Sequence, residues 1–154
     1  MTGCLFCEIA AGSKPARIVW ESDQIVAFLD HRPVFPGHCL VVPRSHFETL
    51  PELPDGLLSP LFGAARLVAA AMVPGLRADG TFVAVNNRVS QSVPHLHVHV
   101  VPRRFKDGLR GFFWPRQPYR DDEEAEQYRT RLKAAIERLE SDRAEDGSGR
   151  VHSD

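Results

Sequence analysis

Short runs of apolar residues, separated by polar turn residues, recur along the chain, and such runs predict strands. Four of these stretches are rich in β-branched or aromatic residues and are bounded by turn residues: residues 17–21, 25–29, 38–42 and 81–86. Ser22-Asp23-Gln24 separates the first two and predicts an antiparallel hairpin. A fifth strand is predicted over residues 95–101, where histidine alternates with leucine or valine.

Helix signals predict three helices. Residues 4–11 form a short one, an N-terminal lid or clip that ends at Gly12. From Asp55 to Val73 apolar residues recur at helical spacing, so we predict a main helix that packs against the sheet and ends at Pro74-Gly75. A further helix is predicted from Asp121 to Glu140, because acidic residues precede basic ones along it, as the helix dipole favours.

Length and composition predict a single domain. The 154 residues are 43% apolar, which is enough for one hydrophobic core. We assign this domain to residues 1–140. Glycine, serine and charged residues dominate residues 141–154, which we predict to be a disordered C-terminal tail.

Charge and cysteine content narrow the function classes. The formal net charge is −1, and positive and negative residues are interspersed. The chain therefore lacks the clustered positive charge of a general nucleic-acid binder or a membrane-surface protein. No apolar run approaches the roughly 20 residues of a membrane span, and the first residues carry no signal-peptide pattern, so we expect a cytoplasmic protein. Three cysteines, an odd number, favour thiols or a metal site over a disulfide framework.

The strand over residues 95–101 carries the candidate chemistry. On a strand, His95, His97 and His99 share one face, and each lies about 6.6 Å from the next along the strand. This spacing suits contacts along a phosphate and its leaving atom. Two other interpretations stay open at this point. Histidine fills the polar positions of an ordinary alternating strand, or the three rings form a metal cage.

The run His95-Leu96-His97-Val98-His99-Val100-Val101 matches the H-φ-H-φ-H-φ-φ signature of the histidine triad family. The similarity spans residues 4–140 and resembles the bacterial members and the hydrolase branches, the Hint and Fhit types, because the third position is histidine. Further matching segments are Gln91-Ser92-Val93, Val100-Val101-Pro102-Arg103, Pro36-Gly37-His38 with Leu40-Val41-Val42-Pro43, and Cys4-Leu5-Phe6-Cys7-Glu8-Ile9. The resemblance implies an α+β fold with a five-stranded antiparallel sheet, two main helices and a two-fold homodimer. We expect residues 55–73 and 81–86 at the dimer interface.

The resemblance also implies a reaction. His97 would attack the α-phosphate of a nucleoside phosphoramidate, a dinucleoside polyphosphate or a related ester. Water would then hydrolyse the nucleotidyl-imidazole and release a nucleoside monophosphate. A neutral imidazole, with a pKa of about 6.5, has a lone pair available near pH 7, so the chemical step needs no metal. The family geometry suggests that the His95 carbonyl accepts a hydrogen bond from Nδ1 of His97.

Other residues match supporting positions of the family. His99 would contact the phosphate, and His38 would orient the triad. Candidates for nucleotide binding, in addition to His97 and His99, are Asp30 at the ribose, Asn86, and Gln91 and Ser92 at the phosphate or leaving group.

The cysteines Cys4 and Cys7 alone are a weak metal signal. His46 and His95 would complete a tetrahedral Cys2His2 zinc site, which bacterial members of the family carry at matching positions. His95 would then be a structural ligand and leave His97 free.

Two other functions remain open. One is a zinc-dependent metallohydrolase in which triad histidines hold the metal and activate water. The other is a nucleotide-binding module with little turnover.

Overall fold

A computed structural model describes residues 3–109 and 117–148 of the chain. The chain divides into two compact units, residues 1–109 and 110–154, whereas the sequence placed one domain over residues 1–140. The first unit contains the sheet, two helices and every candidate site residue. The described residues of the second contain one helix.

The first unit is built on a five-stranded antiparallel sheet, as predicted. Its strands lie in the order β1-β2-β3-β5-β4, with β4 and β1 at the two edges. The strands are β1 (Ile18–Glu21), β2 (Ile25–Leu29), β3 (Cys39–Pro43), β4 (Gly80–Val85) and β5 (Val98–Arg103). Each bound agrees with the predicted strand to within one or two residues, except that β5 begins three residues late.

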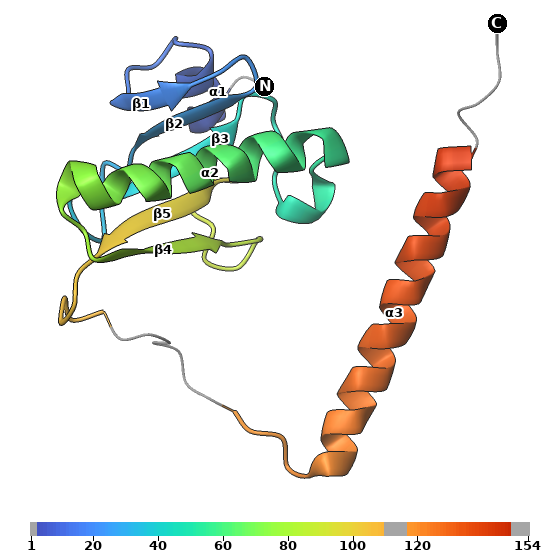
Figure 1. Cartoon of the computed structure of the whole chain (residues 1–154). Coiled ribbons are helices and arrows are strands. Elements are labelled where there is room, and N and C mark those ends of the chain that lie inside the picture. The colour runs from blue at the N-terminus through green and yellow to red at the C-terminus, as the bar shows by residue number, and fades with distance from the viewer. Residues whose placement is uncertain (1–2, 110–116, 149–154) are drawn as a thin grey trace, which may run out of the picture. The chain divides into compact units, whose positions relative to one another are not determined.

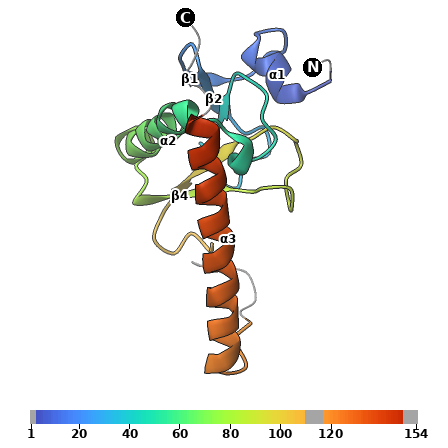
Figure 2. The ribbon, with the colours of Figure 1, turned by 90° about the vertical axis from the view of Figure 1, so that its right-hand side faces the viewer.

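Helices cover both faces of this sheet. The long helix α2 (Asp55–Leu76) crosses one face, and the short helix α1 (Leu5–Ala10) lies on the other (Figures 1 and 2). A short 3-10 helix, Leu50–Glu52, precedes α2. Because strand side chains alternate, two separate cores form. The α2 core includes Ala27, Val41, Leu61, Val68, Leu96, Val98 and Val100, and the α1 core includes Phe6, Val26, Phe28, Leu40 and Val42.

Helix α2 continues past the predicted end at Pro74-Gly75. It ends at Leu76, and Arg77 adopts a left-handed conformation with φ 53°. A proline inside a helix removes one hydrogen bond at a cost of about 3 kcal/mol. Burial of Leu61, Val68 and Met72 against the sheet offsets this cost, so the tertiary packing overrides the local signal.

Among the described residues, α2 is the one helix whose length and apolar composition would suffice to cross a membrane. The sequence analysis found no such run. One face of α2 packs into the core of the first unit, and a core helix meets the same length and composition criteria.

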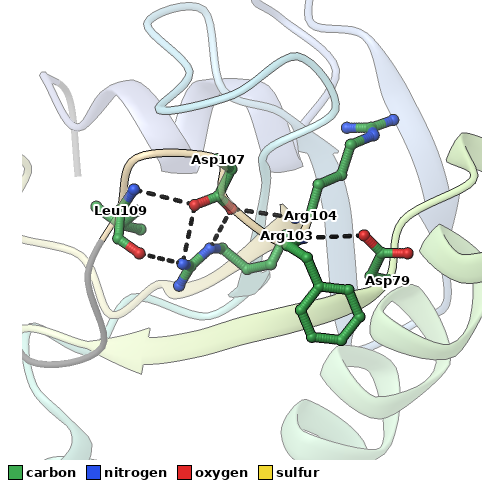
Figure 3. A network of polar contacts seen from close by, with 6 residues as sticks. Asp79, Arg103, Arg104, Asp107 and Leu109 are labelled. Carbon is green, nitrogen blue, oxygen red and sulfur yellow. Dashed lines mark hydrogen bonds and ion pairs between the residues drawn. The ribbon is translucent and has the colours of Figure 1, made fainter.

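A polar network joins the end of β5 and the turn after it to Asp79, which lies between α2 and β4 (Figure 3). The Arg104 guanidinium donates to the Leu76 carbonyl, at the end of α2, at 2.6 Å. The Phe105 N–H donates to the Asp79 carboxylate at 2.9 Å. Arg103 forms a bidentate pair with Asp107 at 2.6 and 3.0 Å, which holds the pKa of that carboxyl well below its usual range. These contacts hold the strand that carries His99.

Helix α3 (Asp122–Ser148) begins one residue after the predicted start and extends eight residues beyond the predicted end. Residues 141–148 are therefore helical, where the sequence analysis expected a disordered tail; residues 149–154 lie outside the described part. The helix exposes 49–63% of Tyr128, Leu132, Ile136 and Leu139.

Candidate active site and metal centre

The histidine segment joins the sheet later than predicted. β5 begins at Val98, so His99 is within the strand, while His95 and His97 precede it. The Leu96 N–H donates to the Phe47 carbonyl at 2.6 Å, and the His95 N–H donates to the Val93 carbonyl at 2.8 Å. Residues 95 and 96 thus form hydrogen bonds outside the β5 ladders, and of the three histidines His99 alone is within the strand. The alternation itself is confirmed, because Leu96, Val98 and Val100 are all fully buried in the α2 core.

His97 has one defined protonation pattern when neutral. Its Nδ1 lies 2.7 Å from the carbonyl oxygen of His95, and a carbonyl can only accept, so Nδ1 carries the proton. The Nε2 lone pair is therefore free. The ring packs edge-on against Phe6 at 5.2 Å and against His99 at 4.8 Å between centroids, and only 4% of the residue is exposed. In the neutral ring this places a nitrogen lone pair, a nucleophile, at the wall of a cavity.

A chain of hydrogen bonds determines the tautomer of His99. The Val34 N–H donates to Nδ1 of His38 at 3.1 Å, so the proton of neutral His38 is on Nε2. This Nε2–H donates to Nδ1 of His99 at 3.0 Å, which leaves the proton of His99 on its own Nε2. Burial lowers the pKa of His38 and lowers that of His99 to about 4, so both rings are mainly neutral near pH 7. His99 thus presents an N–H donor beside the free nitrogen of His97.

The rings of His97 and His99 line a cavity of about 700 Å³. Four of the predicted site residues line it: His97, His99, Ser92 and Asp30. Asp30 also accepts a hydrogen bond from the Arg32 N–H at 2.9 Å. The apolar part of the wall comes from Leu5, Phe6, Ile9, Phe28, Leu29 and Leu40, and Lys14 and Arg17 also line it.

The predicted residues Asn86 and Gln91 do not line this cavity. Gln91 accepts from the Arg88 N–H at 2.7 Å and donates to the Glu48 carbonyl at 2.6 Å. Asn86 donates to a backbone carbonyl of the loop that follows β4, at 3.3 Å. Both amides therefore shape the loop that leads to Ser92.

Sequence reasoning missed two contributors to the site. It interpreted residues 4–11 as a lid or clip and did not assign Leu5, Phe6 and Ile9 to a cavity wall, although their spacing places them on one side of a helix. It also missed the backbone N–H of Val34. No sequence pattern identifies that contact, because any residue except proline supplies an N–H.

The other candidate site is a cluster of Cys4, Cys7, His46 and His95, whose ligand atoms all lie within 4.8 Å of one another. Nδ1 of His95 lies 3.4 Å from Sγ of Cys4 and 3.5 Å from Sγ of Cys7, and Nδ1 of His46 lies 3.4 Å from Sγ of Cys7. A tetrahedral zinc ion with ordinary bond lengths places sulfur and nitrogen ligands about 3.6 Å apart. The four residues therefore fit zinc as the sequence predicts.

The surroundings of His95 also suit a metal ligand. Its Nε2 lies 2.8 Å from the Pro43 carbonyl and must donate to it, which leaves the Nδ1 lone pair directed at the thiols. Burial lowers the pKa of His95 to about 4, so the ring is neutral, as metal binding requires. Burial also raises the pKa of the Cys7 thiol.

A second cluster, Asp30, His38 and His99, has ligand atoms equally close together. Its hydrogen bonds leave few lone pairs for a metal. Both nitrogens of His38 and Nδ1 of His99 are already engaged. This pattern suits a hydrogen-bond relay better than a metal cage.

Comparison with known proteins identifies the class that this fold and these histidines define. Residues 11–106 match the HIT domain family, and the chain belongs to that family. Among its relatives, the protein named Hit from Bacillus subtilis is 34% identical over 140 residues, which are 90% of this chain and 95% of the relative. Adenosine 5'-monophosphoramidase from Schizosaccharomyces pombe is 31% identical over 121 residues, 78% of this chain and 89% of the relative.

Solved structures of the family superimpose on the same fold. A HIT family protein from Bacillus subtilis has a TM-score of 0.74 at 31% identity and covers 99% of each chain. A zinc-bound histidine triad protein from Mycobacterium smegmatis has a TM-score of 0.67 at 35% identity, and the match covers 90% of this chain and 96% of that chain.

A further relative by sequence is an adenylylsulfatase from Arabidopsis thaliana. It is 32% identical over 108 residues, which are 69% of this chain and 55% of the relative.

Proposed function

We propose that this chain is a nucleotide hydrolase that forms a covalent nucleotidyl-histidine intermediate on His97. Its substrates are nucleoside phosphoramidates, dinucleoside polyphosphates or related nucleotidyl esters. The observation that carries the proposal is the hydrogen bond from Nδ1 of His97 to the His95 carbonyl, which leaves Nε2 free at the cavity. The relatives named as a monophosphoramidase and an adenylylsulfatase support a reaction at an adenylyl group.

The reaction has two steps. Nε2 of His97 forms a bond to the α-phosphorus while the bond from phosphorus to the leaving group breaks with its electron pair. Water then attacks the same phosphorus, the bond to Nε2 breaks, and a nucleoside monophosphate leaves with the histidine restored. Both steps place negative charge on the equatorial phosphate oxygens, which hydrogen-bond donors can stabilise.

The neighbouring residues supply those donors and hold the substrate. The Nε2–H of His99 and the hydroxyl of Ser92 donate to the phosphate oxygens, and the Asp30 carboxylate accepts from the ribose hydroxyls. His38 is a positioning residue, because its hydrogen bond determines the tautomer of His99. The apolar wall receives the base; a cavity of about 700 Å³ is within the usual range for a ligand of this size. Asn86 and Gln91 act indirectly, by holding the loop that carries Ser92.

We propose zinc as a structural cofactor on Cys4, Cys7, His46 and His95. When bound, zinc cross-links the N-terminal helix to the histidine segment and stabilises the fold. The proposed chemical steps do not pass through it. The ligand distances and the zinc-bound relative from Mycobacterium smegmatis support the assignment.

We propose a homodimer formed through β4 and α2. β4 is an edge strand of the sheet, and Val83 on it is 45% exposed. Leu58, Phe62 and Leu67 of α2 are 37–49% exposed. We assign the protein to the cytoplasm, where its three free cysteines would stay reduced.

Mass spectrometry tests the proposed reaction. The protein is exposed briefly to adenylyl and guanylyl phosphoramidates and to dinucleoside polyphosphates, and is then quenched and digested. We expect one nucleotidyl group on the peptide that contains His97. Turnover without an adduct that is lost on chelation and restored by added metal would favour the metallohydrolase. Binding without turnover of any compound would favour the nucleotide-binding module.

A further inference from the structure

We propose that α1 couples the zinc site to the nucleotide site, so that metal and nucleotide each strengthen the binding of the other. The inference rests on the proposed nucleotide binding and goes beyond it. It assigns to Phe6 and His95 the role of positioning residues that connect two sites.

Helix α1 depends on anchors outside itself. It contains six residues, and an isolated helix of this length is unstable in water. At its N-terminal end, Cys4 and Cys7 face His46 and His95. At its C-terminal end, the Arg44 guanidinium donates to the Ala10 carbonyl. Loss of the metal would therefore remove the cross-link at this end of the helix and leave only the weaker contacts between the thiols and the imidazoles.

The same helix forms a wall of the cavity. Leu5, Phe6 and Ile9 line it, and Phe6 lies between the two cysteines in sequence. Phe6 is 5% exposed, and its ring packs edge-on against His97 at 5.2 Å and against Phe28 at 5.4 Å. A shift of α1 would thus move an aromatic wall away from the nucleophile and from the apolar surface offered to the base.

A second connection runs through His95. Its side chain contributes Nδ1 to the metal cluster, and its backbone carbonyl accepts the hydrogen bond from Nδ1 of His97. A metal that holds the His95 ring also holds this carbonyl. One residue therefore links the position of the metal to the orientation of the nucleophile.

Thermodynamic linkage determines the size and symmetry of the effect. If metal tightens nucleotide binding by some factor, nucleotide must tighten metal binding by the same factor, and such factors are commonly about 5- to 150-fold. We expect about tenfold. A metal site that stabilises the fold without affecting the nucleotide site would give a factor of one.

The test uses the full chain, with AMP and zinc as probes. AMP binding to zinc-loaded and zinc-depleted protein is measured by calorimetry, and zinc affinity is measured against a competing chelator with and without saturating AMP. We expect both ratios to be about ten and equal. Equal AMP affinity of the two forms would overturn the coupling alone. Failure of the zinc-loaded protein to bind AMP would overturn the proposed function as well.

Two variants keep the test decisive if the zinc-depleted chain does not fold. In the zinc-loaded state, Phe6→Leu should retain zinc in the absence of AMP but lose most of the AMP-induced gain in zinc affinity. Cys39→Ala is the control for a substitution of a buried residue outside α1, because Cys39 lies outside the metal cluster and contacts the Gly37 carbonyl. It should keep the full gain. A Phe6→Leu variant with the gain of the parent protein would overturn the role of α1.

Discussion

The carbonyl oxygen of His95 lies 2.7 Å from Nδ1 of His97. This contact joins a candidate metal ligand to the candidate nucleophile two residues away. It determines which nitrogen of His97 is free, and it lies directly before β5, which begins at Val98.

Replacing His97 by alanine should remove the covalent step and leave the fold intact. His97→Ala should bind AMP and lose turnover by a factor on the order of 10³ or more, measured under single-turnover conditions. His97→Gly should regain part of the activity when imidazole is added, because the small ring can occupy the vacated space. A variant that keeps a tenth of the parent rate, on a parent that forms no adduct, would rule out covalent catalysis.

Metal analysis after purification without chelator should find one zinc per chain. Replacing both Cys4 and Cys7 by serine should abolish this zinc and lower the melting temperature by about 5 °C or more, since a structural metal stabilises only the folded state. The folded fraction should keep some turnover. Parent protein with well under one equivalent of metal would contradict the site.

Stability should fall as the pH falls from about 6.5 to about 4. Burial lowers the pKa of His99 to about 4, so in this window the unfolded chain binds a proton that the folded chain does not bind. His38 adds to the effect in the same direction. His99→Gln, which cannot titrate, should lose less melting temperature between these pH values than the parent. Parallel curves for the two proteins would show that His99 is not responsible.

A charge on the β4 edge should disrupt the proposed dimer. Val83→Lys places two like charges at a β4 contact, whereas Val19→Lys places them on β1, the opposite edge of the sheet. The two valines are 45% and 49% exposed, so the substitutions are matched in burial. Light scattering should give a monomer for the first and a dimer for the parent and the second. A monomeric parent at micromolar concentration would refute the dimer.

A chain that ends at Glu140 should keep its activity and the melting temperature of the first unit. The deletion removes the last turns of α3, in which Ser141, Asp142 and Ala144 are exposed, and the segment that follows. Little apolar surface is lost, so little stabilisation is lost. A decrease of many degrees would show that this segment contributes to the fold.

Local patterns predicted those parts of the fold that depend on neighbours in sequence. Apolar runs bounded by turn residues located four strands, and alternation located the fifth. Helical spacing located α2, and helix-end and charge signals located α1 and the start of α3. The errors occurred at element ends. The ends of α2 and β5 depend on packing against the sheet and on hydrogen bonds such as the one from Leu96 to Phe47, which local composition does not encode.

The sequence by itself determined the residue types at the site: three alternating histidines, a Cys-x-x-Cys pair, and the resemblance that connects them to nucleotide chemistry. Only the tertiary structure decided which of these residues belong to the metal cluster and which line the cavity. The packing of α1 against the sheet brings Cys4 to within 3.4 Å of His95, 91 positions away. The pairing of β3 with β5 brings His38 to within 3.0 Å of His99, 61 positions away. The histidines therefore differ in function because each is hydrogen-bonded to a different distant partner, and such contacts form only when the chain has folded.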